Sequence, residues 1–335
     1  MTAGARHSDA GMTPGVLRDG ASALGGANPR GCPHLSICLR ALLPTCQIAR
    51  GEAMITEPMA VFGLGRWGLT LARTLLDAGL PLVAVSSQRP RVKQELPDPL
   101  WPLWTGDTQR LVERARWIFL TVRDDAIEPT ARRLASLRTD WTGYTFVHSS
   151  GAHGRELLEA LHQRGARTGV FHPLNAFPDP LRHPTTVAGT PFGIIADEDL
   201  RSDLFELAEK LGGRPFAIPP DLRSVYHLVA VLVANAPLVL ISLGRELLRR
   251  SGLEPDVRWE YYAVLLQSAL SHATDPEPIL YLTGPWARRD RTTVRQHRDA
   301  LQGLYPEAVP LYEQLVALAQ ALYLAATGQP MGGEI

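Results

Sequence analysis

The sequence predicts an α/β domain with a mainly parallel, doubly wound sheet, followed by an all-α domain. Three observations support this prediction. Short apolar runs alternate with amphipathic stretches between residues 59 and 218, a glycine-rich turn follows the first run, and helical patterns alone remain after Pro219-Pro220. Such alternation is typical of βαβ units, which build parallel sheets. A chain of 335 residues is long enough for two cores.

The predicted strands are the apolar runs Met59–Phe62, Leu82–Val85, Trp117–Val122, Tyr144–Val147, Gly169–Phe171, Phe192–Ala196 and Phe216–Ile218. The helices predicted between them are Leu69–Ala78, Ala126–Leu137, Gly154–Arg164 and Leu200–Leu211. Gly212-Gly213 suits the end of the last helix, because glycine tolerates a left-handed backbone there.

The second domain is predicted to be helical throughout, over about 221–250, 255–272, 292–301 and 306–326. Asp221 is the expected N-cap of the first helix, and Gly252 follows its end. The apolar run Leu228–Leu243 has about sixteen residues where a membrane span needs about twenty, and it contains Asn235 and Pro237. We therefore expect a central buried helix.

The predicted boundaries are 1–55 for an extension, 57–219 for the α/β domain and 220–328 for a helical substrate and dimerisation domain. The extension is rich in Gly, Ala, Pro and Ser, which is typical of a disordered segment, of a start codon placed too far upstream, or of a targeting tail. The spacing of its three cysteines matches neither a paired zinc-ligand motif nor a redox pair, so no metal is expected, and their odd number argues against a disulfide framework. Absence of cysteine from the body agrees with a cytoplasmic protein.

The overall charge and composition narrow the class of partner. Formal net charge is zero, and 45% hydrophobic with 20% charged residues is ordinary for a soluble globular chain. The charge gives no reason to expect nucleic acid or a membrane surface as partner. We expect a small-molecule substrate, and a homodimer formed through the helical domain because its long apolar helices need more cover than one chain supplies.

A phosphate-binding loop is predicted at Gly63-Leu64-Gly65-Arg66-Trp67-Gly68, between the first strand and the first helix. The first glycine permits the tight turn, the second allows close approach of a pyrophosphate, and the third lets the helix pack on the strand. The helix N-terminus offers free N–H groups to the phosphates. This arrangement indicates a Rossmann-type domain that binds a nicotinamide dinucleotide.

The end of the second strand favours NADP (NADPH) over NAD. It reads Val85-Ser86-Ser87-Gln88-Arg89, with Arg91 beyond, and offers no carboxylate for a ribose 2′-hydroxyl. Ser86, Ser87 and Arg89 are therefore expected to hold a 2′-phosphate. Alternatively, the arginines are simply solvated.

Two further loops follow strands at the edge where ligands bind in such sheets. Val122 and Arg123 are expected to border the cofactor, while Asp124 or Asp125 caps the next helix. The run His148-Ser149-Ser150-Gly151 has small hydroxyl residues and a glycine, so Ser149 is expected near the nicotinamide end or the substrate.

Several of these motifs, in this order, resemble one bacterial family. They are the glycine loop, 121–127, 148–152, 171–177, Tyr226-His227, Asn235 and 282–285. The family, a domain of unknown function numbered 2520, has a Rossmann-like domain with a helical C-terminal domain. It is similar to alternative ketopantoate reductases and to other NADP-dependent 6-phosphogluconate-dehydrogenase-like reductases. Arg123 departs from a usual proline, and the sequence has no lysine after Lys210, which excludes ketopantoate reduction through a helical-domain lysine.

The candidate catalytic residues are His172, His227, Asn235, Thr283 and Arg288. His172 follows an apolar strand and is either a proton donor or a structural histidine. His227, near the start of a long apolar helix, is either a site residue or a residue that only packs in the core. Asn235, expected to be buried, needs a ligand, a neighbouring chain or a backbone group as partner. Thr283 and Arg288 lie in a loop where Arg288 could bind a carboxylate, or where Asp290 simply caps the next helix.

These features predict an NADP-dependent oxidoreductase that reduces a small carbonyl acid or imine, with ketopantoate as the named substrate. The alternative is a dinucleotide-binding sensor or scaffold protein without turnover.

Overall fold

The computed structural model describes residues 56–88, 96, 98–177, 179–180, 186–254 and 256–332. The predicted extension at 1–55, with its cysteines, lies outside these residues. So do Arg89 and Arg91, on which the NADP prediction depends.

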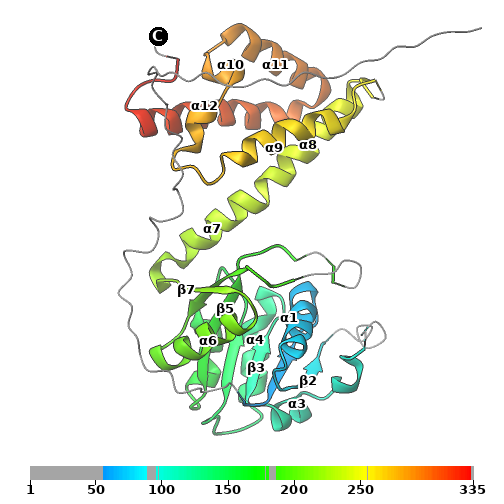
Figure 1. The fold of residues 1–335 in the computed structure, drawn as a ribbon, viewed down its shortest axis with the longest axis vertical. Coiled ribbons are helices and arrows are strands. Elements are labelled where there is room, and N and C mark those ends of the chain that lie inside the picture. The colour runs from blue at the N-terminus through cyan, green and yellow to red at the C-terminus, as the bar shows by residue number, and fades with distance from the viewer. Residues whose placement is uncertain are drawn as a thin grey trace, which may run out of the picture. The chain divides into compact units, whose positions relative to one another are not determined.

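A seven-stranded sheet with the order β2-β1-β3-β4-β5-β6-β7 forms the centre of the α/β region (Figure 1). Its strands are β1 Met59–Phe62, β2 Leu82–Ser86, β3 Trp117–Leu120, β4 Thr145–His148, β5 Arg167–Pro173, β6 Pro191–Ile195 and β7 Arg214–Ala217. All neighbours are parallel except β5 and β6. Because β2 and β3 lie on opposite sides of β1, the strand order reverses there, and ligands bind at such points.

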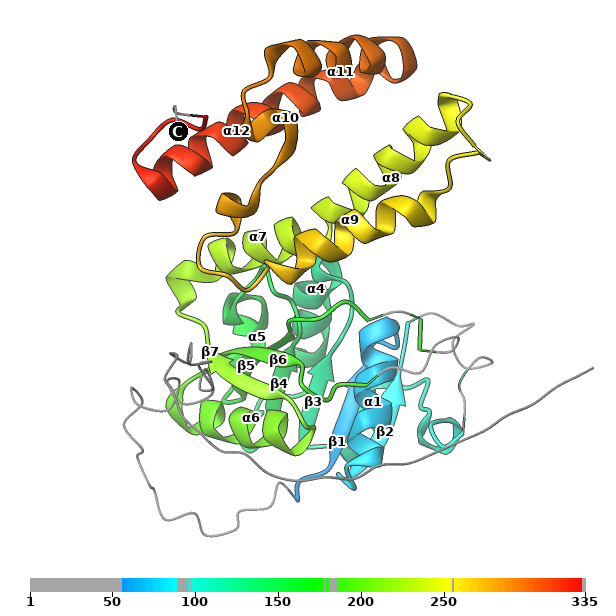
Figure 2. The ribbon, with the colours of Figure 1, turned by 45° about the horizontal axis from the view of Figure 1, so that its top comes forward.

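Helices cover both faces of this sheet (Figure 2). The cluster on one face includes α1 Arg66–Asp77 and α6 Glu198–Lys210, and the other includes α3 Thr108–Arg114, α4 Asp124–Ala135, η2 Arg155–Leu158 and α5 Glu159–His162. Strand β3 is apolar throughout because both of its faces are buried. Trp117 and Phe119 belong to the first cluster, and Ile118 and Leu120 belong to the second. A short turn, η1 Trp101–Leu103, follows β2.

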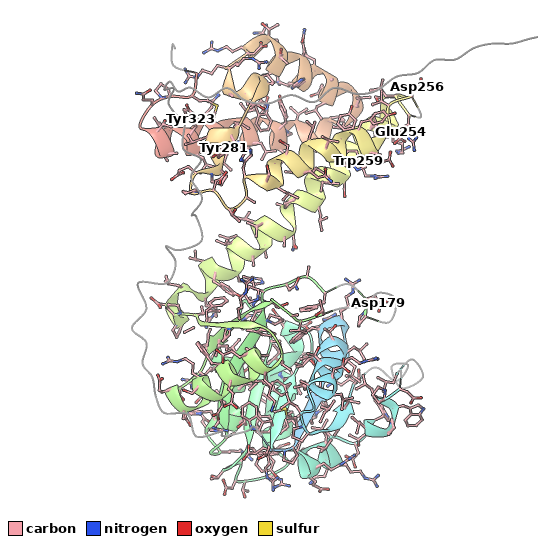
Figure 3. All side chains as sticks on the ribbon, viewed as in Figure 1. Asp179, Glu254, Asp256, Trp259, Tyr281 and Tyr323 are labelled. Atoms are coloured by element: carbon pink, nitrogen blue, oxygen red, sulfur yellow. The ribbon has the colours of Figure 1, made fainter. Side chains whose placement is uncertain are left out.

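Beyond β7, the described residues form helices and turns. These are η3 Pro220–Leu222, α7 Arg223–Ala234, α8 Ala236–Arg250, α9 Trp259–Ser271, η4 Pro278–Tyr281, α10 Gly284–Ala287, α11 Arg291–Leu304, η5 Pro306–Ala308 and α12 Val309–Thr327. Glu254 and Asp256 lie in the connection between α8 and α9, and Trp259 begins α9 (Figure 3).

Several local predictions are wrong. Asp221 is not an N-cap, because Pro220 starts a 3-10 turn and Leu222 takes the cap position of α7. The helix expected over 221–250 is two helices that meet at Asn235, just before Pro237. The helix expected at 154–164 is a 3-10 turn followed by the short α5. Helix α3 was not predicted at all. The glycine terminators are confirmed, since Gly212 and Gly252 have φ of 78° and 74°.

The expectation of a central buried helix over 228–243 is also wrong for this chain. Leu228 is 55% exposed and Val233 69% exposed, because the described part of the single chain places too few helices over α7 and α8. By length and composition alone, the segments Pro220–Arg250 and Pro306–Thr327 are apolar enough to cross a membrane, which for one or two helices is weak evidence.

Candidate functional site

The turn between β1 and α1 is packed so closely that side chains are excluded from two of its glycines. Gly63 has φ of 112°, and a Cβ there would lie 2.7 Å from the backbone of Thr121. A Cβ on Gly68 would lie 1.8 Å from the carbonyl oxygen of Gly63, which accepts a hydrogen bond of 2.5 Å from the Thr121 hydroxyl. Strand, turn and helix are thus fixed against β3.

Gly65 differs from these two glycines because the space beside it is open. A Cβ there would meet no atom within 4 Å, and the residue is the N-cap of α1 without a side-chain cap. The first turn of α1 also contains no acidic residue. Free N–H groups at a helix N-terminus beside open space are suited to a diphosphate. The residues present therefore match the phosphates of a dinucleotide.

The other predicted loop residues have local roles. Leu64 is buried in the core, whereas Arg66 is exposed. The Trp67 indole donates a hydrogen bond of 2.8 Å to the Ser149 hydroxyl, and its ring lies 4.8 Å from that of Phe177. Trp67 and Ser149 therefore join the glycine loop to the loop after β4.

Ser86 and Ser87 lie where the sequence predicts the cofactor ribose. Ser86 is buried, and its carbonyl oxygen accepts a hydrogen bond of 2.8 Å from the Gly63 N–H, so the ends of β1 and β2 are tied together. Ser87 and Gln88 follow as the last described residues of this segment, and neither is acidic.

The acids after β3 are placed differently from the prediction. Arg123, not Asp124 or Asp125, is the N-cap of α4, and it forms an exposed ion pair with Asp125. That pair lowers the pKa of Asp125. Asp124 instead accepts a hydrogen bond of 2.9 Å from the Ser150 hydroxyl, which links α4 to the loop after β4. Val122 packs against the core beneath α4.

His148 organises the loop after β4 from inside the protein. Its Nε2 lies 2.8 Å from the Gly154 carbonyl oxygen, and its Nδ1 accepts a hydrogen bond of 3.1 Å from the Ser150 N–H. Nε2 therefore carries the proton, since Nδ1 is an acceptor. Burial lowers the pKa of His148, so the ring is neutral.

His172 lies at the centre of a cluster formed by β5, the loop after β4 and the first turns of α7. Its Nδ1 is 2.7 Å from the Tyr226 hydroxyl, and its ring centroid is 6.3 Å from that of His227. Gly151 lies against both histidines, because a Cβ there would be 2.6 Å from His172 Nε2 and 2.8 Å from His227 Cδ2. The structure thus brings together His172 and His227, two of the predicted catalytic residues.

Burial sets the protonation of this cluster. Burial, and after it the neighbouring His227, lowers the pKa of His172 to about 4. Burial also raises the pKa of the Tyr226 hydroxyl to about 12. At neutral pH the cluster therefore holds a neutral imidazole against a protonated phenol, an arrangement that can donate a hydrogen bond or a proton to a substrate heteroatom.

Arg223 links the start of α7 to the segment after β4 through contacts with Glu156. Its guanidinium forms two contacts with Glu156, of 3.3 and 3.2 Å, and a Cβ on Gly154 would lie 2.2 Å from its Nη1. The Glu156 carboxylate also accepts from the Gly154 N–H at 2.9 Å. This contact positions the helix that carries Tyr226 and His227.

The remaining predicted residues are not part of this cluster. Asn235 is exposed and has no side-chain cap bond at the junction of α7 and α8, so the expectation of a buried amide is wrong. Thr283 is the N-cap of α10, and the exposed Arg288 is its C-cap. Asp290 caps α11 by accepting a 3.0 Å hydrogen bond from the Thr293 N–H, as the local alternative predicted.

Sequence reasoning left Tyr226 and Asp124 out of the site, whereas it placed Gly151 in a loop near the cofactor or the substrate. Tyr226 was named only within the family motif, and its partner His172 is fifty-four residues away. The available signal was the pair Tyr226-His227 at the start of an apolar helix. Within the described ranges, no group of three or more His, Cys, Asp or Glu side chains is placed to hold a metal ion.

A pH dependence of stability follows from the low pKa of His172. In the unfolded chain this histidine titrates near 6.5, whereas in the folded chain it titrates near 4. Above pH 6.5 the ring is neutral in both states, and the free energy of unfolding has its full value. As the pH falls toward 4, the ring is protonated in the unfolded chain first, and the free energy of unfolding decreases. We expect His172 to reduce the free energy of unfolding by about 3 kcal/mol across this window. Urea unfolding of wild type and His172→Gln should show a steeper loss in the wild type; equal slopes would contradict the assignment.

The sheet order, the glycine turn and the helices after β7 define a Rossmann-like fold with a helical C-terminal region, as predicted. The model of the family described as domain of unknown function DUF2520 matches residues 190–319. The resemblance stated from the sequence motifs is confirmed over these residues. No curated protein sequence gives a significant match.

Solved structures share this fold along most of their length. A putative NADP oxidoreductase, BF3122 from Bacteroides fragilis, has a TM-score of 0.67 and 22% identity, over 79% of this chain and 98% of that one. A reductive aminase from Aspergillus terreus in complex with NADPH and ethyl levulinate has a TM-score of 0.60 and 13% identity, over 83% of this chain and 96% of that one. An imine reductase from Pseudomonas sp. has a TM-score of 0.58 and 17% identity, over 82% of this chain and 96% of that one.

Proposed function

We propose that this protein is an NADP-dependent oxidoreductase that reduces the C=N or C=O bond of a small substrate. The observation that carries the proposal is the open space beside Gly65 at the start of α1, which has no side-chain cap. Gly63 and Gly68, on either side of it in the sequence, are packed too closely to admit a Cβ. The serines at the end of β2 and the NADPH in the complex of the Aspergillus terreus reductive aminase support NADP over NAD.

NADPH, when bound, supplies a hydride, and this chain must hold the substrate and a proton. The loop 63–68 would hold the diphosphate, with Ser86 and Ser87 beside the ribose. Tyr226 carries its proton at neutral pH, and His172 fixes the orientation of the hydroxyl. His227 lies beside this pair and packs against Gly151.

An imine is the substrate class we favour. The reductive aminase and imine reductase among the structural neighbours support this choice, whereas none of the three similar structures named above is a ketopantoate reductase. A partly buried, neutral donor pair also suits an imine, whose nitrogen needs a proton when the carbon receives a hydride.

The test is a binding titration followed by a turnover assay. NADPH and NADH are titrated by protein fluorescence, and oxidation of the cofactor is then followed with a cyclic imine, with ketone plus amine, and with ketopantoate. We expect tighter NADPH binding and oxidation with the imine. Binding without oxidation across the panel would overturn the enzyme proposal in favour of a sensor. Tighter NADH binding would overturn the choice of NADP, and Arg89→Ala should then have little effect.

We further propose a soluble, cytoplasmic homodimer that covers the exposed apolar face of α7. Leu228 and Leu232 are each 55% exposed on this helix, one turn apart. Light scattering should give about twice the chain mass of 36.7 kDa. The double substitution Leu228→Glu and Leu232→Glu should reduce the mass to that of a monomer, whereas a monomeric wild type, or one that needs detergent, would contradict the proposal.

A further inference from the structure

The groove between α10, α11 and α12 is lined by arginine side chains. The three helices lie together in both ribbon views (Figures 1 and 2), and the groove encloses about 430 Å³. Its lining includes Arg289, Arg291, Arg295, Arg298, Trp286 and Tyr312. Three of the arginines follow one another along α11 at positions that share one face of the helix.

Within the described residues, most of this positive charge has no carboxylate partner. Arg298 pairs with Glu313 across the groove at 2.8 Å. In the part of the chain that the structure describes, no carboxylate lies within 4.0 Å of the guanidinium of Arg289, Arg291 or Arg295. Three like charges in one groove repel one another, and an anion bound among them relieves that repulsion.

The floor of the groove is aromatic and held in place by hydrogen bonds. The Trp286 indole donates to the Tyr312 hydroxyl at 3.0 Å, and His297 Nδ1 lies 2.8 Å from the same hydroxyl. The two aromatic rings lie 5.6 Å apart at 68°. A fixed apolar floor beneath a charged rim is suited to a ligand with anionic groups on an organic body.

Arg289 is held in an unusual conformation at the rim. Its φ of 52° is the one positive value among the non-glycine residues that the structure describes. Gly332 packs against its aliphatic stem, since a Cβ there would lie 3.2 Å from Arg289 Cγ and Cδ. Arg289 directly follows Arg288, the C-cap of α10, and a left-handed residue at this position is a common way for a helix to end.

We propose that this groove binds a small organic phosphate, with Arg289, Arg291 and Arg295 as the ligands of its phosphate groups. The planar guanidinium fork matches phosphate oxygens in pairs. None of the lining residues belongs to the glycine loop or to the His172 cluster. The site is additional to the dinucleotide site and does not depend on the proposed reduction.

Calorimetric titration with inorganic pyrophosphate tests the proposal. Because the glycine loop also offers a phosphate site, the titration is made in the Gly65→Val protein as well as in the wild type. The variant Arg291→Gln/Arg295→Gln should bind pyrophosphate at least about tenfold more weakly than its parent. The matched control is Arg110→Gln/Arg114→Gln, which removes two exposed arginines with the same spacing from α3 and should retain parental affinity.

The outcomes separate clearly. A selective loss in the α11 variant, with an unchanged melting temperature, supports the site. Equal affinity of the two double variants, or no binding by the Gly65→Val parent, would overturn it. Failure of the reductase assay leaves these expectations unchanged.

Discussion

Gly65→Val is expected to abolish useful binding of NADPH while the protein remains folded. A valine there meets no protein atom through its Cβ, but its side chain fills the space beside the start of α1. We expect the dissociation constant to rise at least about 100-fold, or about 2.8 kcal/mol. Loss of a glycine N-cap costs roughly 1 kcal/mol, so the melting temperature should fall by about 3 °C.

Two further glycines serve as controls for this prediction. Gly106→Val should leave binding unchanged, because a Cβ there approaches only Trp104 Nε1, at 3.9 Å. Gly68→Val should instead destabilise the fold, because its Cβ would lie 1.8 Å from the Gly63 carbonyl oxygen. Wild-type affinity of the Gly65→Val protein for NADPH, measured by fluorescence titration, would show that the phosphates bind elsewhere.

Tyr226→Phe is expected to lower kcat about 100-fold or more, as removal of a general acid does. The change removes the hydroxyl that lies 2.7 Å from His172 Nδ1 and leaves the glycine loop untouched. The dissociation constant of NADPH should therefore not change. Steady-state rates with the imine, measured beside an NADPH titration, separate the two effects.

The matched control for this substitution is Tyr144→Phe. Tyr144 is buried, whereas Tyr226 is partly buried, and the Tyr144 hydroxyl is bonded to Arg116, away from the His172 cluster. Its removal should leave kcat unchanged. If Tyr226→Phe retained full turnover, the proton would have to come from another group, and His227 would be the next residue to substitute.

The strands and the glycine loop could be predicted because their signals are local. A continuous apolar run such as Trp117–Leu120 must be buried on both faces, which only a covered parallel sheet provides. The glycine spacing reports a backbone requirement that no other residue satisfies, and the structure confirms it at Gly63 and Gly68.

The candidate active site was predicted less completely because it depends on contacts between distant segments. His172 gave a local signal at the end of a strand, but its partner Tyr226 is brought to it by the packing of α7. The exposure of Leu228 and Asn235 was missed for a different reason. Apolar composition predicts that a helix needs cover, not that the same chain supplies it.

The close packing of Gly63 and Gly68 has a consequence for the thermodynamics of cofactor association. Glycine loses more conformational entropy on ordering than any other residue, and here that loss occurs when the chain folds. The loop then needs no ordering when a dinucleotide arrives, since Thr121 already fixes its carbonyl. Affinity at this loop is therefore reduced by the lost motion of the ligand and not by that of the protein.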